Sequence, residues 1–172
     1  FDDTLIIRPT AGSKQAEWST TSGPGPCGRR GHTLTPLDDN RLLLFGGTTR
    51  TASFNDLYLF DAGKMRWLPV VGVTGDLPSP RAFHSAVIVN KVLVVTGGTN
   101  GDRVYGLEHD TIHAFDTTSG KWDQVATPGG QAGLPPRFAH AAAPVDRQFI
   151  VLGGLNPFGV STSAQVPTGQ LC

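Results

Sequence analysis

The chain has 172 residues, enough for one domain of ordinary size, and its 14 basic and 14 acidic residues cancel, which excludes a chain-wide attraction to nucleic acid or to an anionic membrane. The 22 glycines and 13 prolines favour many short elements joined by turns, and no apolar run approaches the ~20 residues of a membrane span. Two cysteines, Cys27 and Cys172, are too few for the disulfide framework of a small secreted domain, so we expect a reducing, cytoplasmic setting.

Two short strands are expected before residue 20. An apolar run from Thr4 to Ile7 follows Asp3, and Trp18 comes after it, in an order that repeats in outline the second half of two later units. The match is weaker than the match between those units, because Arg8 stands where they carry a second aspartate. We interpret residues 1–20 as the third and fourth strands of such a unit.

Each later unit contains four predicted strands. Their runs are short, rich in β-branched and aromatic residues, and bounded by turn-forming residues, a pattern that is typical of strands. The segments 38–40 and 90–91 are predicted hairpin turns, because Asn and Asp tolerate positive φ. The predicted strands are 31–37, 41–46, 56–61 and 65–70 in the first unit, and 83–89, 91–97, 110–116 and 121–126 in the second.

Three motifs recur in phase, with 51 and then 56 residues between successive glycine pairs. A glycine pair ends each of three apolar runs, Arg-x-x-His precedes each pair, and in the two complete units a tryptophan follows a Phe-Asp run. We assign the glycines to tight bends and the tryptophans to the wedges between sheets. The structural residues are Gly46, Gly47, Gly97, Gly98, Gly153, Gly154, Trp67 and Trp122.

A repeat of about 50 residues with these features resembles the kelch repeat. The resemblance covers residues 1–154 and implies an all-β fold, a partial kelch-type β-propeller of about three blade-equivalents, each a four-stranded antiparallel sheet. The opening Pro78-x-x-Arg81-x-x-His84-Ser85 is most similar to the subgroup with long loops between blades. The implied segments are outer strands of a preceding blade (1–20), two blades (21–70 and 71–126), inner strands of a further blade (127–154) and an irregular tail (155–172).

The resemblance further implies a non-catalytic protein-interaction module, a scaffold or adaptor that binds another protein through loops on one face. The expected loops are 48–55, 71–80, 99–109 and 127–136.

Four arginines are the candidate partner-binding residues. Arg29, Arg81 and Arg137 precede the innermost strands, and arginines near that position hold acidic peptides in some kelch domains. The alternative is that each guanidinium braces a turn or pairs with an acid of its own blade, such as Asp56 or Asp110. The fourth candidate is Arg30, which has no counterpart in the other repeats.

Enzymatic readings remain as alternatives, either a metal-dependent kelch enzyme or an accessory domain fused to a phosphatase. A copper-radical oxidase needs two tyrosines at its metal, and one of the two present, Tyr58, stands at the regular aromatic position of the repeat. His32, His84 and His140 would have to converge to share a metal, and hydrogen bonding within each blade is favoured. We therefore expect no metal and no cofactor.

The predicted strands do not close a propeller, and unpaired sheet edges need a cover. Two explanations are open. In the first, the remainder of a longer chain supplies further blades; in the second, another copy supplies the inner strands that complete the outer ones.

Overall fold

The computed structural model describes residues 4–9, 12, 14, 16–21, 23–100, 111–125, 135–156 and 159–160. Every element among these residues is a β-strand, so the expected all-β fold is confirmed. The strands are β1 (Leu5–Pro9), β2 (Ala16–Thr20), β3 (Thr33–Asp38), β4 (Arg41–Phe45), β5 (Leu57–Asp61), β6 (Arg66–Pro69), β7 (Thr74–Gly75), β8 (Ser85–Val89), β9 (Val92–Thr96), β10 (Ile112–Asp116), β11 (Lys121–Val125), β12 (Ala141–Val145), β13 (Gln148–Leu152), β14 (Leu155–Asn156) and β15 (Gly159–Val160).

The first complete sheet consists of β3, β4, β5 and β6 in chain order, all antiparallel. Asp38 closes the β3–β4 turn, because its carboxylate accepts a hydrogen bond from the Asn40 N–H and pairs with Arg41. Leu43, Leu44 and Phe45 of β4 are all buried, as expected for a strand covered on both faces. All four strands lie within two residues of their predicted bounds.

The second complete sheet contains β8 to β11 in the same order, with the short strand β7 added in parallel to β11. The β8–β9 turn places Asn90 and Lys91 at φ 51° and 66°, which confirms the predicted positive-φ turn. Strand β7 was not predicted from the sequence. It extends the sheet by one strand and covers the outer edge of β11.

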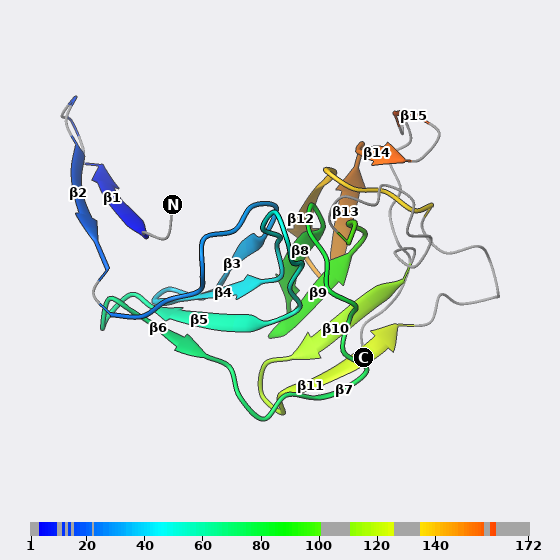
Figure 1. Ribbon diagram of the computed structural model, residues 1–172, viewed down its shortest axis with the longest axis horizontal. Coiled ribbons are helices and arrows are strands. Elements are labelled where there is room, and N and C mark those ends of the chain that lie inside the picture. Colours follow the sequence, from blue (N-terminus) through cyan, green and yellow to red (C-terminus); the bar gives the residue numbers. More distant parts are fainter. Residues whose placement is uncertain are drawn as a thin grey trace.

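Neighbouring sheets pack face to face through apolar clusters. Phe45 and Leu57 of the first sheet meet Leu93, Phe115 and Trp122 of the second. A second cluster joins strands β8 to β10 to the β12–β13 hairpin. The inner strands β3, β8 and β12 are in contact in that order, as the innermost strands of successive propeller blades are (Figure 1).

Two hairpins lie at opposite ends of this row of sheets (Figure 1). At one end, the β1–β2 hairpin contacts the first sheet through Ile6 and through a hydrogen bond of 2.9 Å from Trp67 Nε1 to Thr4 Oγ1. At the other end, β12 and β13 pair only with each other among the described residues. Each end is therefore half of a four-stranded sheet.

The region after residue 154 differs from the irregular tail that we expected. Leu155–Asn156 pair with Gly159–Val160, and Leu155 also forms an isolated bridge with Phe138. Phe138 and Leu155 are far apart in the sequence, so no local pattern reveals their bridge. Residues 161–172 lie outside the described residues.

Candidate partner-binding face

The described parts of the loops after the first two glycine pairs and of the connections before β3 and β8 lie on the same side of the molecule. Isolated bridges join the two kinds of segment at Arg30 with Thr48 and at Ala82 with Thr99. The Asn55 amide donates a hydrogen bond of 3.0 Å to the Pro78 carbonyl. Residues far apart in the sequence thus form one continuous loop surface.

The glycine pairs connect each sheet to the next at the base of this surface. The N–H of Gly47 donates to the Arg81 carbonyl at 2.8 Å, and the N–H of Gly98 donates to the Arg137 carbonyl at 2.9 Å. A Cβ on Gly46 would lie 2.7 Å from the same Arg81 carbonyl oxygen. The pairs are therefore required by close approach between sheets as well as by their left-handed φ.

The arginines of the Arg-x-x-His motifs complete the connection. Nη1 of Arg29, Arg81 and Arg137 donates to the carbonyl of the first glycine in the same unit, at 3.0, 3.1 and 3.2 Å. Nε of each also donates to the carbonyl two residues earlier, at 3.1 to 3.3 Å. We call the arginine–glycine bond, together with the glycine–arginine bond to the next unit, the glycine–arginine junction.

Two of these arginines, Arg81 and Arg137, are too deeply buried to contact a partner at the surface. Arg81 is 1% exposed and Arg137 2%, and burial lowers the pKa of Arg81 to about 10. Arg29 pairs with Asp56 at 2.5 Å and lies over the Phe54 ring at 4.1 Å. This geometry corresponds to the alternative in which the guanidinium pairs with an acid of its own unit, here Asp56. Asp110, the other acid considered, lies outside the described residues.

The histidines depart from the bonding that we expected. His84 Nε2 forms a hydrogen bond of 2.9 Å with Thr33 Oγ1, which belongs to the neighbouring sheet, so the expectation of bonding within one blade is wrong for this residue. The His140 carbonyl likewise accepts from Ser85 Oγ of the preceding sheet at 2.8 Å. Sequence spacing could not reveal this, because the partners are 51 and 55 positions away. Within the described part of the chain, no three His, Cys, Asp or Glu residues form a group that could hold a metal ion.

The tryptophans lie where the repeat predicts. Trp122 is fully buried, with its ring 5.3 Å from the Phe45 ring of the first sheet. Trp67 packs on Phe60, with ring centroids 5.0 Å apart, and contacts the β1–β2 hairpin through Thr4. Both fill wedges between neighbouring sheets, as expected.

The exposed part of the face carries polar and cationic side chains. Arg30, Arg50, Thr51 and Asn100 are exposed on it. A polar pocket of about 110 Å³ lies between the 48–53 loop and Asn100. Arg50 and Asn100 were not singled out from the sequence, although Arg50 is the only charged residue between the glycine pair and Asn55.

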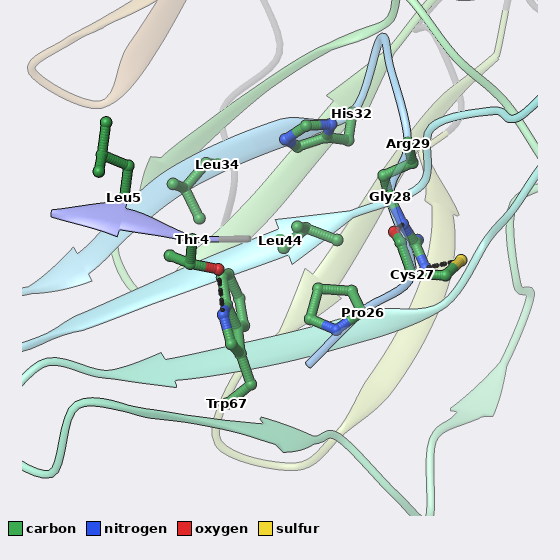
Figure 2. Close-up of a pocket in the computed structure, with 10 residues that line it drawn as sticks. All are labelled: Thr4, Leu5, Pro26, Cys27, Gly28, Arg29, His32, Leu34, Leu44 and Trp67. Carbon is green, nitrogen blue, oxygen red and sulfur yellow. Dashed lines mark hydrogen bonds between the residues drawn. The ribbon is translucent and has the colours of Figure 1, made fainter. Parts of the chain in front are cut away.

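A second pocket, of about 230 Å³, opens beside the first sheet near the β1–β2 hairpin. Figure 2 shows Leu34, Leu44 and Trp67 around it, with the Arg29–Cys27 contact at its side. Its position, where the inner strands of a preceding sheet would lie, distinguishes it from the loop face.

No helix in the part of the chain that the structure describes has the length and apolar character needed to cross a membrane.

Comparisons with known proteins agree with this architecture. The family model described as the KLHDC2/KLHL20/DRC7 Kelch-repeats domain matches residues 3–164. A solved structure described as the structure of YjhT superposes with a TM-score of 0.74 at 16% identity, over 98% of this chain and 56% of that one. At this identity the superposition shows a shared fold.

Relatives in several organisms match at higher identity. The chain is 34% identical to Adagio protein 3 of Arabidopsis thaliana over 165 residues, 32% identical to the Rab9 effector protein with kelch motifs of Mus musculus over 143, and 30% identical to Kelch domain-containing protein 3 of Homo sapiens over 129. These matches cover 90%, 81% and 75% of this chain. The chain spans only 25%, 36% and 32% of those proteins. The repeat, the sheets and these matches together establish that the chain belongs to the kelch-repeat family and forms part of a kelch β-propeller.

Proposed function

We propose that this chain is a non-catalytic protein-interaction module, which binds another protein through the loop face above the glycine–arginine junctions. Its blades are the segments 21–70 and 71–126, with half-blades in 1–20 and 127–154. The module would serve as a scaffold or adaptor in the cytoplasm.

The observation that carries the proposal is a contrast between two parts of the loop face. Its buried part is held by Arg81 and Arg137, which donate hydrogen bonds to backbone carbonyls. Its exposed part consists of loop side chains above these arginines, and recognition residues are commonly found on loops that a rigid scaffold positions. One of the relatives is named as an effector of Rab9, a name that describes a protein partner for that protein.

Two exposed cations support the proposal of an acidic partner segment. Arg29, Arg81 and Arg137 direct their guanidinium groups at carbonyls and at Asp56. Arg30 and Arg50 are exposed beside the Arg30–Thr48 bridge. An acidic peptide segment would therefore meet these two cations, and arginine suits carboxylates because it can donate two parallel hydrogen bonds.

Affinity capture with the purified chain tests this function. The double variant Arg30→Glu/Arg50→Glu should lose at least tenfold in affinity for a captured protein partner, and the loss should shrink at high salt. The matched control is Arg66→Glu/Arg147→Glu, which reverses two exposed charges next to hairpin turns on the opposite face. Equal binding by both double variants, or no protein partner at all, would contradict the proposal.

A further inference from the structure

The small polar pocket of the loop face lies at the boundary between two successive repeats. Its volume is about 110 Å³, and it is lined by residues 48–53 of the first repeat and by Asn100 of the second. Asn100 follows the pair Gly97–Gly98 at the same distance as Thr49 follows Gly46–Gly47. The pocket therefore lies between the two complete sheets, and none of its lining residues belongs to the hairpins at the ends of the row.

The hydroxyl groups of the 48–53 loop hold its backbone in one conformation. Thr49 Oγ1 accepts hydrogen bonds from the N–H groups of Thr51 and Ala52, at 3.2 and 3.1 Å. Thr48, only 3% exposed, donates from Oγ1 to the carbonyls of Thr49 and Ala52, both at 3.0 Å. Ser53 Oγ donates to Thr48 Oγ1 at 3.2 Å. Little of this loop would have to be ordered when a ligand binds, which reduces the entropic cost of binding.

Backbone pairing anchors both sides of the pocket to the connections before the inner strands. Thr48 exchanges two hydrogen bonds with Arg30, both at 2.9 Å. Thr99, the residue before Asn100, exchanges two with Ala82, at 2.7 and 2.8 Å. The distance across the pocket is therefore fixed by the two sheets.

Three side chains offer hydrogen-bond donors to the pocket. Arg50, Thr51 and Asn100 are exposed and line it. Among the described residues, the Arg50 guanidinium and the Asn100 amide have neither a hydrogen bond nor an ion pair. The contact of the Thr51 hydroxyl is with Thr49 Oγ1 at 3.5 Å, a distance too long for a strong hydrogen bond. A guanidinium, an amide and a hydroxyl are thus available to a ligand.

The charge of the lining favours an anion. Arg50 is the only charged residue among those that line the pocket, and none of them is acidic. The carbonyls of Thr49 and Ala52, which could otherwise serve a cation, already accept hydrogen bonds from Thr48. Arginine suits an oxyanion because it can donate two parallel hydrogen bonds.

The volume and the placement of the donors favour a phosphoryl group. A water molecule takes up ~30 Å³ in the liquid, so the pocket holds a group of roughly four or five heavy atoms. A carboxylate offers two oxygens in one plane, whereas a phosphoryl group offers three strong acceptor oxygens that point in different directions. Donors from two separate segments of the chain match the second arrangement better.

We propose that this pocket binds the phosphoryl group of a phosphorylated serine or threonine in the acidic segment of the protein partner. Arg50 supplies the positive charge, and Asn100 and Thr51 donate to the remaining oxygens. That the group is carried by a protein rests on the function proposed above, whereas the anion pocket itself does not. Phosphorylation of the partner would then strengthen its binding to the loop face.

A titration with inorganic phosphate, followed by NMR of the full chain at constant ionic strength, tests the pocket. The backbone amides of Arg50 and Thr51 and the side-chain amide of Asn100 should shift and reach saturation. Arg50→Gln, which removes the charge and keeps a polar side chain, should weaken phosphate binding at least tenfold. The matched control is Arg30→Gln, which removes an exposed charge of the same face outside the pocket and should stay within about twofold.

Two results of this titration would overturn the proposal. One is phosphate binding that Arg50→Gln leaves unchanged, or shifts that do not saturate. The other is acetate binding as tight as phosphate binding, which would show that the pocket does not distinguish a phosphoryl group from a carboxylate.

Peptide libraries test the source of the phosphoryl group. Degenerate peptides rich in Asp and Glu would carry phosphoserine, serine or glutamate at one fixed central position. The phosphoserine library should bind at least tenfold more tightly than the other two, and Arg50→Gln should abolish the difference. Binding of inorganic phosphate without any preference among the libraries would overturn the assignment to a partner protein. Loss of partner capture with intact phosphate binding would instead contradict the function proposed for the loop face.

Discussion

At the scale of single residues, the glycine–arginine junction explains why the recurring glycines and arginines cannot be replaced by other residues without a cost in stability. In the first two pairs, the carbonyl of the first glycine accepts from the arginine of its own unit, and the glycine lies against the arginine carbonyl of the next unit. A methyl group at this position therefore meets backbone atoms, which cannot move aside without separating two sheets.

Gly97 and Gly120 form a matched pair for testing this account. Both have left-handed φ, 66° and 71°, but a Cβ on Gly97 would collide with the Arg137 carbonyl and the His140 ring, whereas a Cβ on Gly120 would meet nothing within 4 Å. Gly120→Ala should lower the free energy of unfolding by ~1 kcal/mol, the cost of the left-handed conformation. Gly97→Ala should lower it by ~3 kcal/mol, because overpacking is added. Urea denaturation of both variants measures the difference, and equal losses would contradict the close contact.

Stability should also depend on pH through His140. Burial and the nearby Arg137 lower the pKa of His140 from 6.5 to about 4, and its ring nitrogens have no hydrogen-bond partner among the described residues. Between these pH values the unfolded chain binds a proton that the folded chain does not. The free energy of unfolding should therefore fall as the pH drops from 6.5 to about 4, by up to ~3 kcal/mol.

Denaturation curves across this pH range for the unmodified chain and for His140→Gln provide the measurement. The variant should show a shallower dependence, since glutamine does not titrate. Part of the slope should remain, because burial and Arg29 also lower the pKa of His32. An identical slope in both proteins would show that His140 is not the titrating group.

Residue-scale prediction from the sequence succeeded where a motif repeats and was incomplete where a contact crosses between repeats. The bends at Gly46 and Gly97 and the burial of Trp122 followed from composition and phase. The bond from His84 to Thr33 did not, because it joins two sheets. The acid partner of Arg29 was among the alternatives, and the structure shows it to be Asp56.

At the scale of elements, β7 shows how a connection can become part of a sheet. The N–H groups of Thr74 and Asp76 donate to the carbonyls of Gly120 and Trp122, at 3.1 and 2.9 Å. A Cβ on Gly75 would overlap the Trp122 carbonyl, so β7 can approach β11 only with glycine at this position. No sequence pattern predicted this strand, because the residues around it, with Gly72, Gly75 and Pro78, are typical of a loop.

Gly75→Ala should therefore detach β7 from β11. The amides of Thr74 and Asp76 should then exchange with solvent deuterium at least tenfold faster, as measured by NMR. Gly72→Ala is the control, because Gly72 also has left-handed φ but an added Cβ there meets nothing within 4 Å. If exchange at Asp76 is unchanged in Gly75→Ala, the hydrogen bonds do not protect this segment.

Trp122 should be the most costly single side chain to truncate between the complete sheets. It is fully buried between Phe45 and Phe115, with ring separations of 5.3 and 5.1 Å. Trp122→Ala should reduce the free energy of unfolding by ~3–5 kcal/mol. Leu77→Ala, at a position 47% exposed, should change it by less than ~0.5 kcal/mol. Thermal denaturation can rank the two, and comparable losses would contradict the packing described.

At the scale of the whole molecule, each sheet is held mainly by its neighbours in the row, so protection should decrease from the centre to the ends. Strands β9 and β10, with sheets on both sides, should show the slowest deuterium uptake by mass spectrometry. Strands β1, β2 and β13, which lie at the two ends of the row, should exchange fastest. A uniform rate across these strands would show a single unfolding unit.

The sequence was sufficient for the kind of fold and for the number of sheets, because every repeat carries its own strands and turns. It could not predict the exposure of Trp18 and Leu152, because the exposure of a strand side chain depends on packing between distant parts of the chain.

The glycine–arginine junction is also one half of a reciprocal contact between successive units. The Gly47 N–H donates to the Arg81 carbonyl of the next unit, and the Phe83 N–H of that unit donates back to the Gly31 carbonyl. The same reciprocal pair recurs one unit later, from Gly98 to Arg137 and from Ala139 to Phe83. Each unit therefore meets the next through backbone bonds in both directions, which fixes the position of one sheet against its neighbour.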